Sequence, residues 1–280
     1  MPRVLMRVAA MVGLCLLLAG GCREKRERIP DELTRARHAY SQGLYLESEA
    51  EFERFLQEYA HHPARWEAWN RLLDIAVSIK SDSEKGLLLL EAMLLEYGDD
   101  KDKAADLLLQ IGDYYADHKN WEKAIEKWHR GRRLSSLPPE KQFPFSLRMA
   151  RSYRAMGYYD MAREVLVRCL REAPDARSLA AVKYDLAMTF TFLENWDKAR
   201  EFLEEVVTAG DLPPEDRAVA GFLLAEVHIH EGRLQQAREL LESILKEHPN
   251  PLTVEIKAEH LKKAIAIEKG RPKPVIEPME

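Results

Sequence analysis

The feature that most constrains this chain is a helical pattern that recurs along most of its length. In the stretch 112–131, GDYYADHKNWEKAIEKWHRG, small residues and large aromatics fall three or four positions apart on either side of a polar break. Residues at those spacings share one helix face. The stretch therefore predicts two helices packed through contacts of small against large side chains, with the candidate contact residues Gly112, Tyr115, Trp121, Ala124 and Trp128.

Copies of this pattern lie on both sides of the stretch. An aromatic residue or leucine opens the second helix of each copy, at positions 45, 121, 159, 196 and 234. The steps are 76, 38, 37 and 38, and a step of 76 is two periods, so a less regular copy should have its second helix open near Ser83. The sequence thus predicts about six repeats with a period of about 38 over residues 29–251. The candidate contact residues of the later copies are Gly157, Tyr159, Ala162, Trp196, Ala199, Gly232 and Ala237.

The pattern resembles the tetratricopeptide repeat, a helix–turn–helix unit that stacks on copies of itself. The resemblance implies an all-α, right-handed α-solenoid, and the unbroken repeat favours one continuous array in which each unit contacts its neighbours. An LPPE sequence at 137–140 recurs at 212–215. Because proline suits the first helical turn, it indicates an early start of the helix that follows. A non-repeating helical bundle is the alternative.

Residues 252–269 predict one more amphipathic helix after the last repeat. Its apolar side has the helical spacing i, i+4, i+7 and i+11, at Val254, Ala258, Leu261 and Ile265. The end of a solenoid must cover an exposed apolar face, so we interpret this helix as a cap. Three prolines follow it, and residues 270–280 are expected to form a disordered tail.

The first 21 residues are different in kind. Arg3 and Arg7 precede an uncharged run, 8–21, that is shorter than a membrane-spanning helix and has the layout of a secretory signal. Because Cys15 would leave with the signal, only Cys169 would remain beside Cys22, which excludes an intramolecular disulfide framework. We expect Cys169 to be a buried, inert thiol.

The signal ends in LAGGC, which resembles the lipoprotein box of bacteria, although Ala19 stands where that box most often has leucine. The resemblance implies cleavage before Cys22 and acylation of this cysteine, with residues 22–28 as a charged tether. Arg23 stands where an aspartate would resemble an inner-membrane retention signal, which favours the outer membrane. An ordinary secretory signal with a chance cysteine is the alternative.

The remaining composition predicts a helical protein without chemistry of its own. The formal net charge is −5, and no basic excess or motif indicates a nucleic-acid partner. No nucleotide-binding, nucleophile-elbow or zinc-protease motif is present. His61 and His62 are neighbours in a loop, and His228 and His230 point in different directions on a helix, so neither pair predicts a metal site. We therefore expect no cofactor, no metal and no enzymatic activity.

The first helix of the fourth repeat carries an arginine stripe, Arg148, Arg151 and Arg154. Between residues 130 and 177 the chain has 11 basic and five acidic residues. In the resembled family, first helices line a groove that binds peptides or proteins, and arginine suits carboxylates and phosphates. The stripe predicts a docking site for an acidic segment, with a solvated charged face as the alternative. On either interpretation, reversing Arg148 and Arg151 to glutamate should leave melting nearly unchanged.

Together these features favour a lipid-anchored scaffold of the bacterial cell envelope, with other envelope proteins as partners. By resemblance, one class of such lipoproteins assists outer-membrane β-barrel assembly, and the segment FLQEYAHHP at 55–63 is similar to the end of its first repeat. Other classes pilot secretin or type IV pilus assembly, or scaffold peptidoglycan enzymes. The competing class is an envelope enzyme or metal-binding protein that uses the groove.

Overall fold

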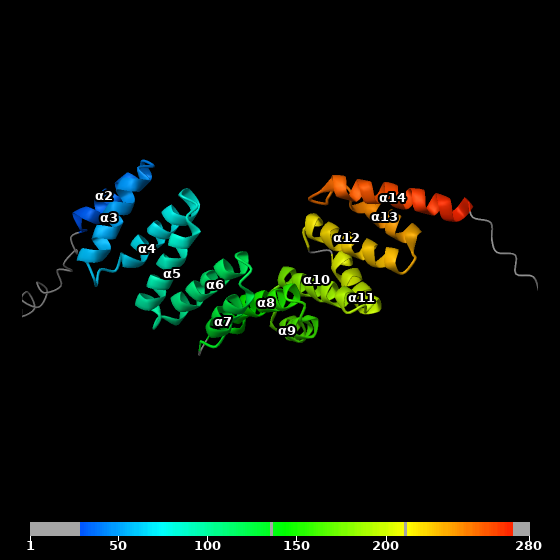
Figure 1. Cartoon of the computed structure of the whole chain (residues 1–280), viewed down its shortest axis with the longest axis horizontal. Coiled ribbons are helices and arrows are strands. Elements are labelled where there is room, and N and C mark those ends of the chain that lie inside the picture. The colour runs from blue at the N-terminus through cyan, green and yellow to red at the C-terminus, as the bar shows by residue number, and fades with distance from the viewer. Residues whose placement is uncertain (1–28, 135–136, 210–211, 271–280) are drawn as a thin grey trace, which may run out of the picture. The chain divides into compact units, whose positions relative to one another are not determined.

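The chain folds into antiparallel helix pairs (Figure 1). The structure is a computed structural model that describes residues 29–134, 137–209 and 212–270. The predicted signal, Cys22 with its tether, and the tail after Gly270 lie outside these ranges. Within them the elements are all helical, with one π-helical segment, η1. They are α2 (Asp31–Ser41), α3 (Tyr45–Glu58), α4 (Arg65–Asp74), η1 (Ile75–Ile79), α5 (Ser83–Tyr97), α6 (Lys101–Asp117), α7 (Trp121–Arg132), α8 (Pro139–Ala155), α9 (Tyr159–Glu172), α10 (Ala176–Phe192), α11 (Trp196–Thr208), α12 (Pro214–His230), α13 (Leu234–Ile244) and α14 (Pro251–Gly270).

The repeat register predicted from the sequence is confirmed. The second helices begin at the five anchor positions and at Ser83, where the irregular copy was expected. The fold is therefore an all-α helical repeat. Pro139 and Pro214 open α8 and α12, as the two LPPE sequences indicate, and each of these helices is 17 residues long.

A left-handed residue precedes every second helix by two positions. The six residues with positive φ are Gly43, Ser81, Lys119, Gly157, Glu194 and Gly232. The prediction that Gly157 and Gly232 are packing residues was wrong, because a Cβ added at either would meet nothing within 4 Å. These glycines instead serve the turn, since a residue without Cβ adopts positive φ without a steric penalty.

Gly112 is a packing glycine, as predicted. A Cβ there would lie 2.2 Å from the indole nitrogen of Trp128, a side chain that is only 2% exposed. The same nitrogen donates a hydrogen bond to the Leu109 carbonyl at 3.2 Å. Close approach of α6 and α7 thus depends on the missing side chain. The alanines of the equivalent second-helix position are fully buried, at Ala124, Ala162, Ala199 and Ala237.

Two of the aromatic anchors contact the end of the next first helix. Tyr159 stacks on Phe192 with ring centroids 4.8 Å apart, and Trp196 stacks on His230 at 3.6 Å. Tyr115 and Trp121 of the third repeat are half-buried. The two stacked pairs link α9 to α10 and α11 to α12.

The expectation of one continuous array needs correction, because the chain divides into two compact units at Asp82 and Ser83. The division falls within the second repeat, between η1 and α5. This repeat opens its second helix with Ser83 instead of an aromatic residue or leucine, and η1 has the wider turn of a π-helix. Unit 1 contains α2 to η1, and unit 2 contains α5 to α14.

The last helix, α14, packs on the sixth repeat of unit 2. Val254 and Leu261 are buried in a cluster with Ala237, Leu241 and other residues of α12 and α13. The opposite face of α14 exposes Leu252, Ile256 and Ile267. The predicted cap is present in the fold. Among the helices described, none has the length and apolarity needed to cross a membrane.

Candidate protein-binding surface

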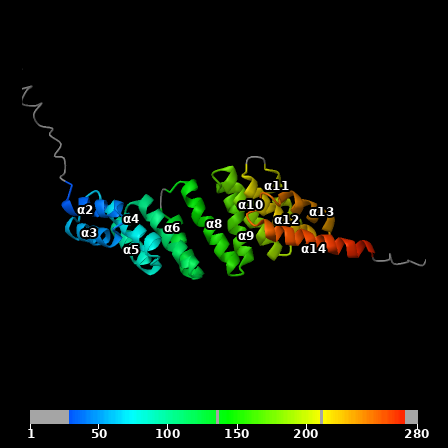
Figure 2. The same ribbon diagram turned by 90° about the horizontal axis from the view of Figure 1, so that it is seen from above.

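The first helices of unit 2 form one face of the repeat stack. In both views α8 lies between α6 and α10 (Figures 1 and 2), and α10 is followed by α12. The three predicted arginines all lie on α8, so their neighbours are α6 on one side and α10 on the other.

Each arginine of the stripe is paired with a carboxylate on a neighbouring first helix. Arg148 donates from Nε to Asp113 Oδ1 of α6 at 2.6 Å. Arg151 Nε contacts Asp185 Oδ2 of α10 at 2.7 Å, and Arg154 Nη1 contacts Asp185 Oδ1 at 2.8 Å. The positive charge of the stripe is therefore compensated by carboxylates within the fold.

Asp185 is the centre of this arrangement. Its side chain is 3% exposed, and Arg154 beside it is 14% exposed, whereas Arg151 is 49% exposed. Arg154 also donates to the Asp185 backbone carbonyl at 3.2 Å. A buried carboxylate with two guanidinium partners joins α8 to α10, and only Arg151 keeps a large part of its side chain free for a ligand.

A pocket of about 200 Å³ opens beside Arg151. Small side chains, Ala180 and Ala181 of α10, form part of its wall, and Tyr184 stands next to them. Burial raises the pKa of Tyr184, so its hydroxyl stays protonated at neutral pH. The full lining is Arg151, Arg177, Ala180, Ala181, Tyr184, Val206, Asp216 and Val219.

The pocket combines an apolar wall with charged groups around it. Arg177 is 67% exposed and its Nε lies 2.9 Å from Asp216 Oδ2 of α12. A small apolar side chain fits against the alanines, and a neighbouring carboxylate would find the guanidinium groups of Arg151 and Arg177. An apolar wall with a few charged groups beside it is the usual composition of a ligand-binding pocket.

Other ion pairs on this face also join successive repeats. Lys141 of α8 lies 2.6 Å from Asp102 of α6, and Lys257 of α14 pairs with Glu226 of α12. The partners are about one repeat apart in the sequence. These pairs help set the register between neighbouring first helices, although exposed pairs contribute little stability each.

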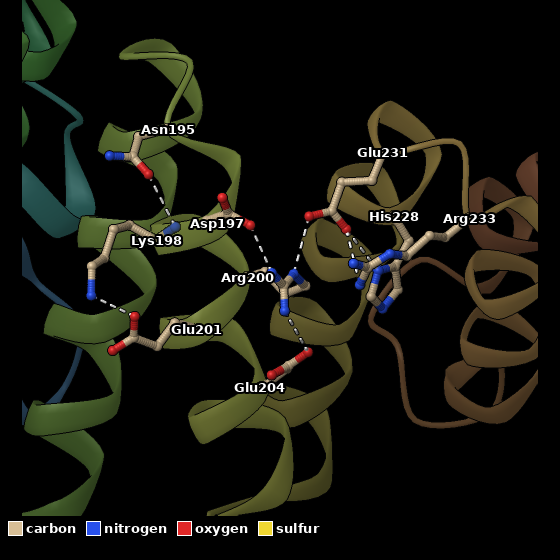
Figure 3. Close-up of polar contacts among 9 residues, drawn as sticks. All are labelled: Asn195, Asp197, Lys198, Arg200, Glu201, Glu204, His228, Glu231 and Arg233. Carbon is tan, nitrogen blue, oxygen red and sulfur yellow. Dashed lines mark hydrogen bonds and ion pairs between the residues drawn. The ribbon is translucent and has the colours of Figure 1, made fainter.

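A second polar cluster joins α11 to the turn between α12 and α13 (Figure 3). Arg200 contacts Glu231 at 3.0 Å and Asp197 at 2.8 Å, and Glu231 also faces Arg233 at 3.3 Å and His228 at 3.5 Å. Because Glu231 lies between two guanidinium groups, its charge is already balanced. We interpret this cluster as a link between the fifth and sixth repeats and not as a binding site.

The side chains that could bind a metal or react as a nucleophile are dispersed or buried. No cluster of three or more potential metal ligands occurs in the part of the chain that the structure describes. His228 is buried beside Glu231, while His230 stacks on Trp196. Cys169 is fully buried and burial raises its pKa to about 11, which keeps the thiol protonated and unreactive.

Comparison with known families supports the repeat assignment. Residues 147–180 and 184–250, both in unit 2, match models described as tetratricopeptide repeat. No curated protein matches the chain by sequence. The matches assign these two segments to tetratricopeptide repeats, and the same helix-pair fold continues in the other described residues.

Solved structures share the fold at low sequence identity. BtubC (BKLC) from P. vanneervenii superposes with a TM-score of 0.57 and 16% identity, covering 90% of this chain and 98% of that chain. The pilF protein of Pseudomonas aeruginosa gives 0.55 and 13%, covering 83% and 96%. YrrB, described as a TPR protein with an unusual peptide-binding site, gives 0.51 and 15%, covering 76% and 97%. At these identities the likeness concerns the fold alone.

Proposed function

We propose that this protein is a lipid-anchored scaffold of the bacterial cell envelope that binds an extended segment of another envelope protein. The observation that carries the proposal is the pocket beside Arg151, which lies on the first-helix face of a tetratricopeptide-repeat fold. Solenoids of this kind use their concave surface to bind peptides and proteins. The peptide-binding site named for YrrB is consistent with this use of the fold.

The pocket favours a segment with a small apolar side chain followed or preceded by a carboxylate. The apolar group would rest against Ala180 and Ala181, and the carboxylate would face Arg151 and Arg177. The Tyr184 hydroxyl would add a hydrogen-bond donor. Asp216 already pairs with the Arg177 guanidinium. An acidic side chain of the partner would compete with Asp216 or share the guanidinium with it.

The pocket is tested by filling it. Ala181→Arg should block the apolar wall, and a photo-crosslinking residue in place of Val219, another lining residue, should capture a partner in the native cell only when position 181 is alanine. A matched crosslinker at Glu242, an exposed residue of α13, controls for random capture. Identical captured proteins at both positions, or full capture despite Ala181→Arg, would contradict the proposed site.

The proposed anchor rests on the LAGGC sequence that ends at Cys22. Two or three acyl chains hold a protein at a membrane, whereas one binds only marginally. Cys22→Ala should abolish incorporation of labelled palmitate and leave the precursor uncleaved. Equal labelling of the variant and the parent protein would disprove lipidation.

Within the envelope, we propose assembly of outer-membrane β-barrel proteins as the role, supported by the likeness of residues 55–63 to that class of lipoproteins. The segment belongs to unit 1, where Phe55 is buried and Tyr59 stacks on it at 5.3 Å. The captured partner decides between roles: a β-barrel assembly component supports this one, and a secretin or a peptidoglycan enzyme would replace it.

A further inference from the structure

Four arginines occupy matching positions at the ends of two neighbouring second helices. Arg130 and Arg168 are 38 positions apart, and so are Arg133 and Arg171, so each pair has the same place in repeats three and four. Arg130 and Arg171 lie in the last turns of α7 and α9, Arg133 directly follows α7, and Arg168 lies one turn before the end of α9. We call these four residues the arginine edge.

The two helix ends lie close to each other. Arg132 Nη2 of α7 and Glu172 Oε1 of α9 are 3.3 Å apart, which joins the C-terminal turns that carry the arginine edge. Arg132 is thereby occupied, and it is not counted in the edge. The helix ends that carry the four remaining arginines are therefore neighbours in unit 2.

The arginine edge has almost no internal charge partner. Arg130, Arg133 and Arg171 are exposed, and their side chains form no ion pair or hydrogen bond with the residues that the structure describes. Arg168 has a single distant pair, 3.7 Å from Glu164. The arginines of residues 130–177 that lack a close carboxylate thus lie at the arginine edge, whereas those of the stripe on α8 are paired.

Helix stability does not account for these residues. Cations near a helix C-terminus interact favourably with the helix dipole, which is the structural explanation for one basic residue per helix. However, the last turns of α3, α5 and α11 contain no basic residue, and neither does that of α13. At the two matching positions α3 has only Arg54 and the end of α13 has only Lys246, and α5 and α11 have no basic residue, so the fold does not require two arginines on each of α7 and α9.

We propose that the arginine edge binds an acidic segment of a partner protein, at a surface separate from the pocket beside Arg151. Guanidinium groups pair with carboxylates in bidentate fashion, and two equivalent pairs on adjacent repeats match a run of acidic side chains along an extended chain. This surface goes beyond the proposed function, because the pocket faces the first helices and the edge lies on the second helices.

A short segment fits the surroundings better than an anionic membrane. Glu126 and Glu164 lie one turn before the edge on the same helices, and Glu205 takes the place of Arg168 in repeat five. The whole chain has a formal net charge of −5. A flat anionic surface would meet these carboxylates together with the arginines, whereas a narrow acidic segment can contact the arginines alone.

The test uses the full-length protein in neutral detergent and a fluorescent peptide of ten glutamates with neutral ends. A variant with Arg130→Gln, Arg133→Gln, Arg168→Gln and Arg171→Gln should bind the peptide about tenfold more weakly or worse at low salt, since each exposed contact contributes modestly. The difference should shrink as salt is added, because screening weakens exposed pairs.

A matched variant controls for net charge. Lys119→Gln, Lys198→Gln, Lys262→Gln and Lys263→Gln remove the same charge from other exposed positions of unit 2 and should leave peptide binding within about twofold of the parent. Equal weakening in both variants would overturn the proposal, and so would absence of peptide binding by the parent.

A parallel arm uses phosphatidylcholine vesicles with and without phosphatidylglycerol. Edge-dependent retention on phosphatidylglycerol without peptide binding would assign the edge to a lipid surface instead.

Discussion

Arg151 and Arg154 on α8 and Arg133 and Arg171 at the arginine edge belong to one basic stretch of the chain, yet their surroundings differ. The first two share Asp185, a buried carboxylate contributed by the next repeat. The other two are exposed on second helices and have no carboxylate within reach among the described residues. A local excess of positive charge therefore consists of two parts, one that holds repeats together and one that is available to a partner.

The largest effect is expected from the carboxylate at the centre of the paired group. Asp185→Ala leaves the nearly buried Arg154 without its partner, and breaking a buried pair costs about 3 kcal/mol or more. Urea unfolding followed by circular dichroism measures the loss. Asp216→Ala is the control, because its pair with Arg177 is exposed and should cost less than about 1 kcal/mol. Equal losses would remove the distinction between buried and exposed pairs.

Charge reversal at the exposed member of the pair should have an intermediate effect. Arg151→Glu places a second carboxylate beside the buried Asp185, and we expect a loss of about 2 kcal/mol in unfolding free energy. The ion pairs of Arg148 and Arg151 thus argue against the sequence-based expectation that reversing both charges leaves the melting temperature nearly unchanged. That expectation treated both residues as ordinary exposed side chains. Thermal melting of Arg151→Glu and Arg151→Gln separates carboxylate repulsion from simple loss of the ion pair. A glutamate variant as stable as the parent protein would contradict the predicted loss.

Substitutions at the arginine edge should hardly affect folding. Arg133→Gln with Arg171→Gln removes two exposed charges that have no ion pair, so stability should change by less than about 0.5 kcal/mol. The substitutions remove a favourable interaction between the arginines and the helix C-terminus, but salt screens this interaction. The same urea titration measures the difference. A loss similar to that of Asp185→Ala would mean that the edge is structural.

A similarly small effect at the turn before α11 separates charge from backbone conformation. Glu194 is an exposed charged residue with φ of 55° at the turn before α11. At the matching position the first, fourth and sixth repeats have glycine. Glu194→Gly should raise the unfolding free energy by about 0.5 kcal/mol, because the strain of positive φ is relieved while glycine loses more entropy on folding. Glu194→Gln should change nothing measurable. If Gln stabilises as much as Gly, charge and not backbone controls this position.

Much of the fold follows from periodicity. Because small and large residues recur with a period of about 38, the start of each second helix could be predicted, including the one at Ser83 that has no anchor side chain. Gly112 and the buried alanines were also predictable, since an i, i+4 pattern of small residues places them in the helix contact. The roles of Gly157 and Gly232 were not, because a sequence pattern does not distinguish a small residue required by packing from one required by positive φ.

The sequence alone thus determined the repeat, its register and the helices that compose it, since these depend on residues three or four positions apart. The tertiary structure alone decided which arginines are paired. The carboxylates that meet Arg148, Arg151 and Arg154 come from α6 and α10, more than 30 positions away along the chain. It also decided that the chain divides at Asp82 and Ser83 and that a pocket opens beside Arg151. Such features arise from contacts between repeats, which a pattern within one helix does not specify.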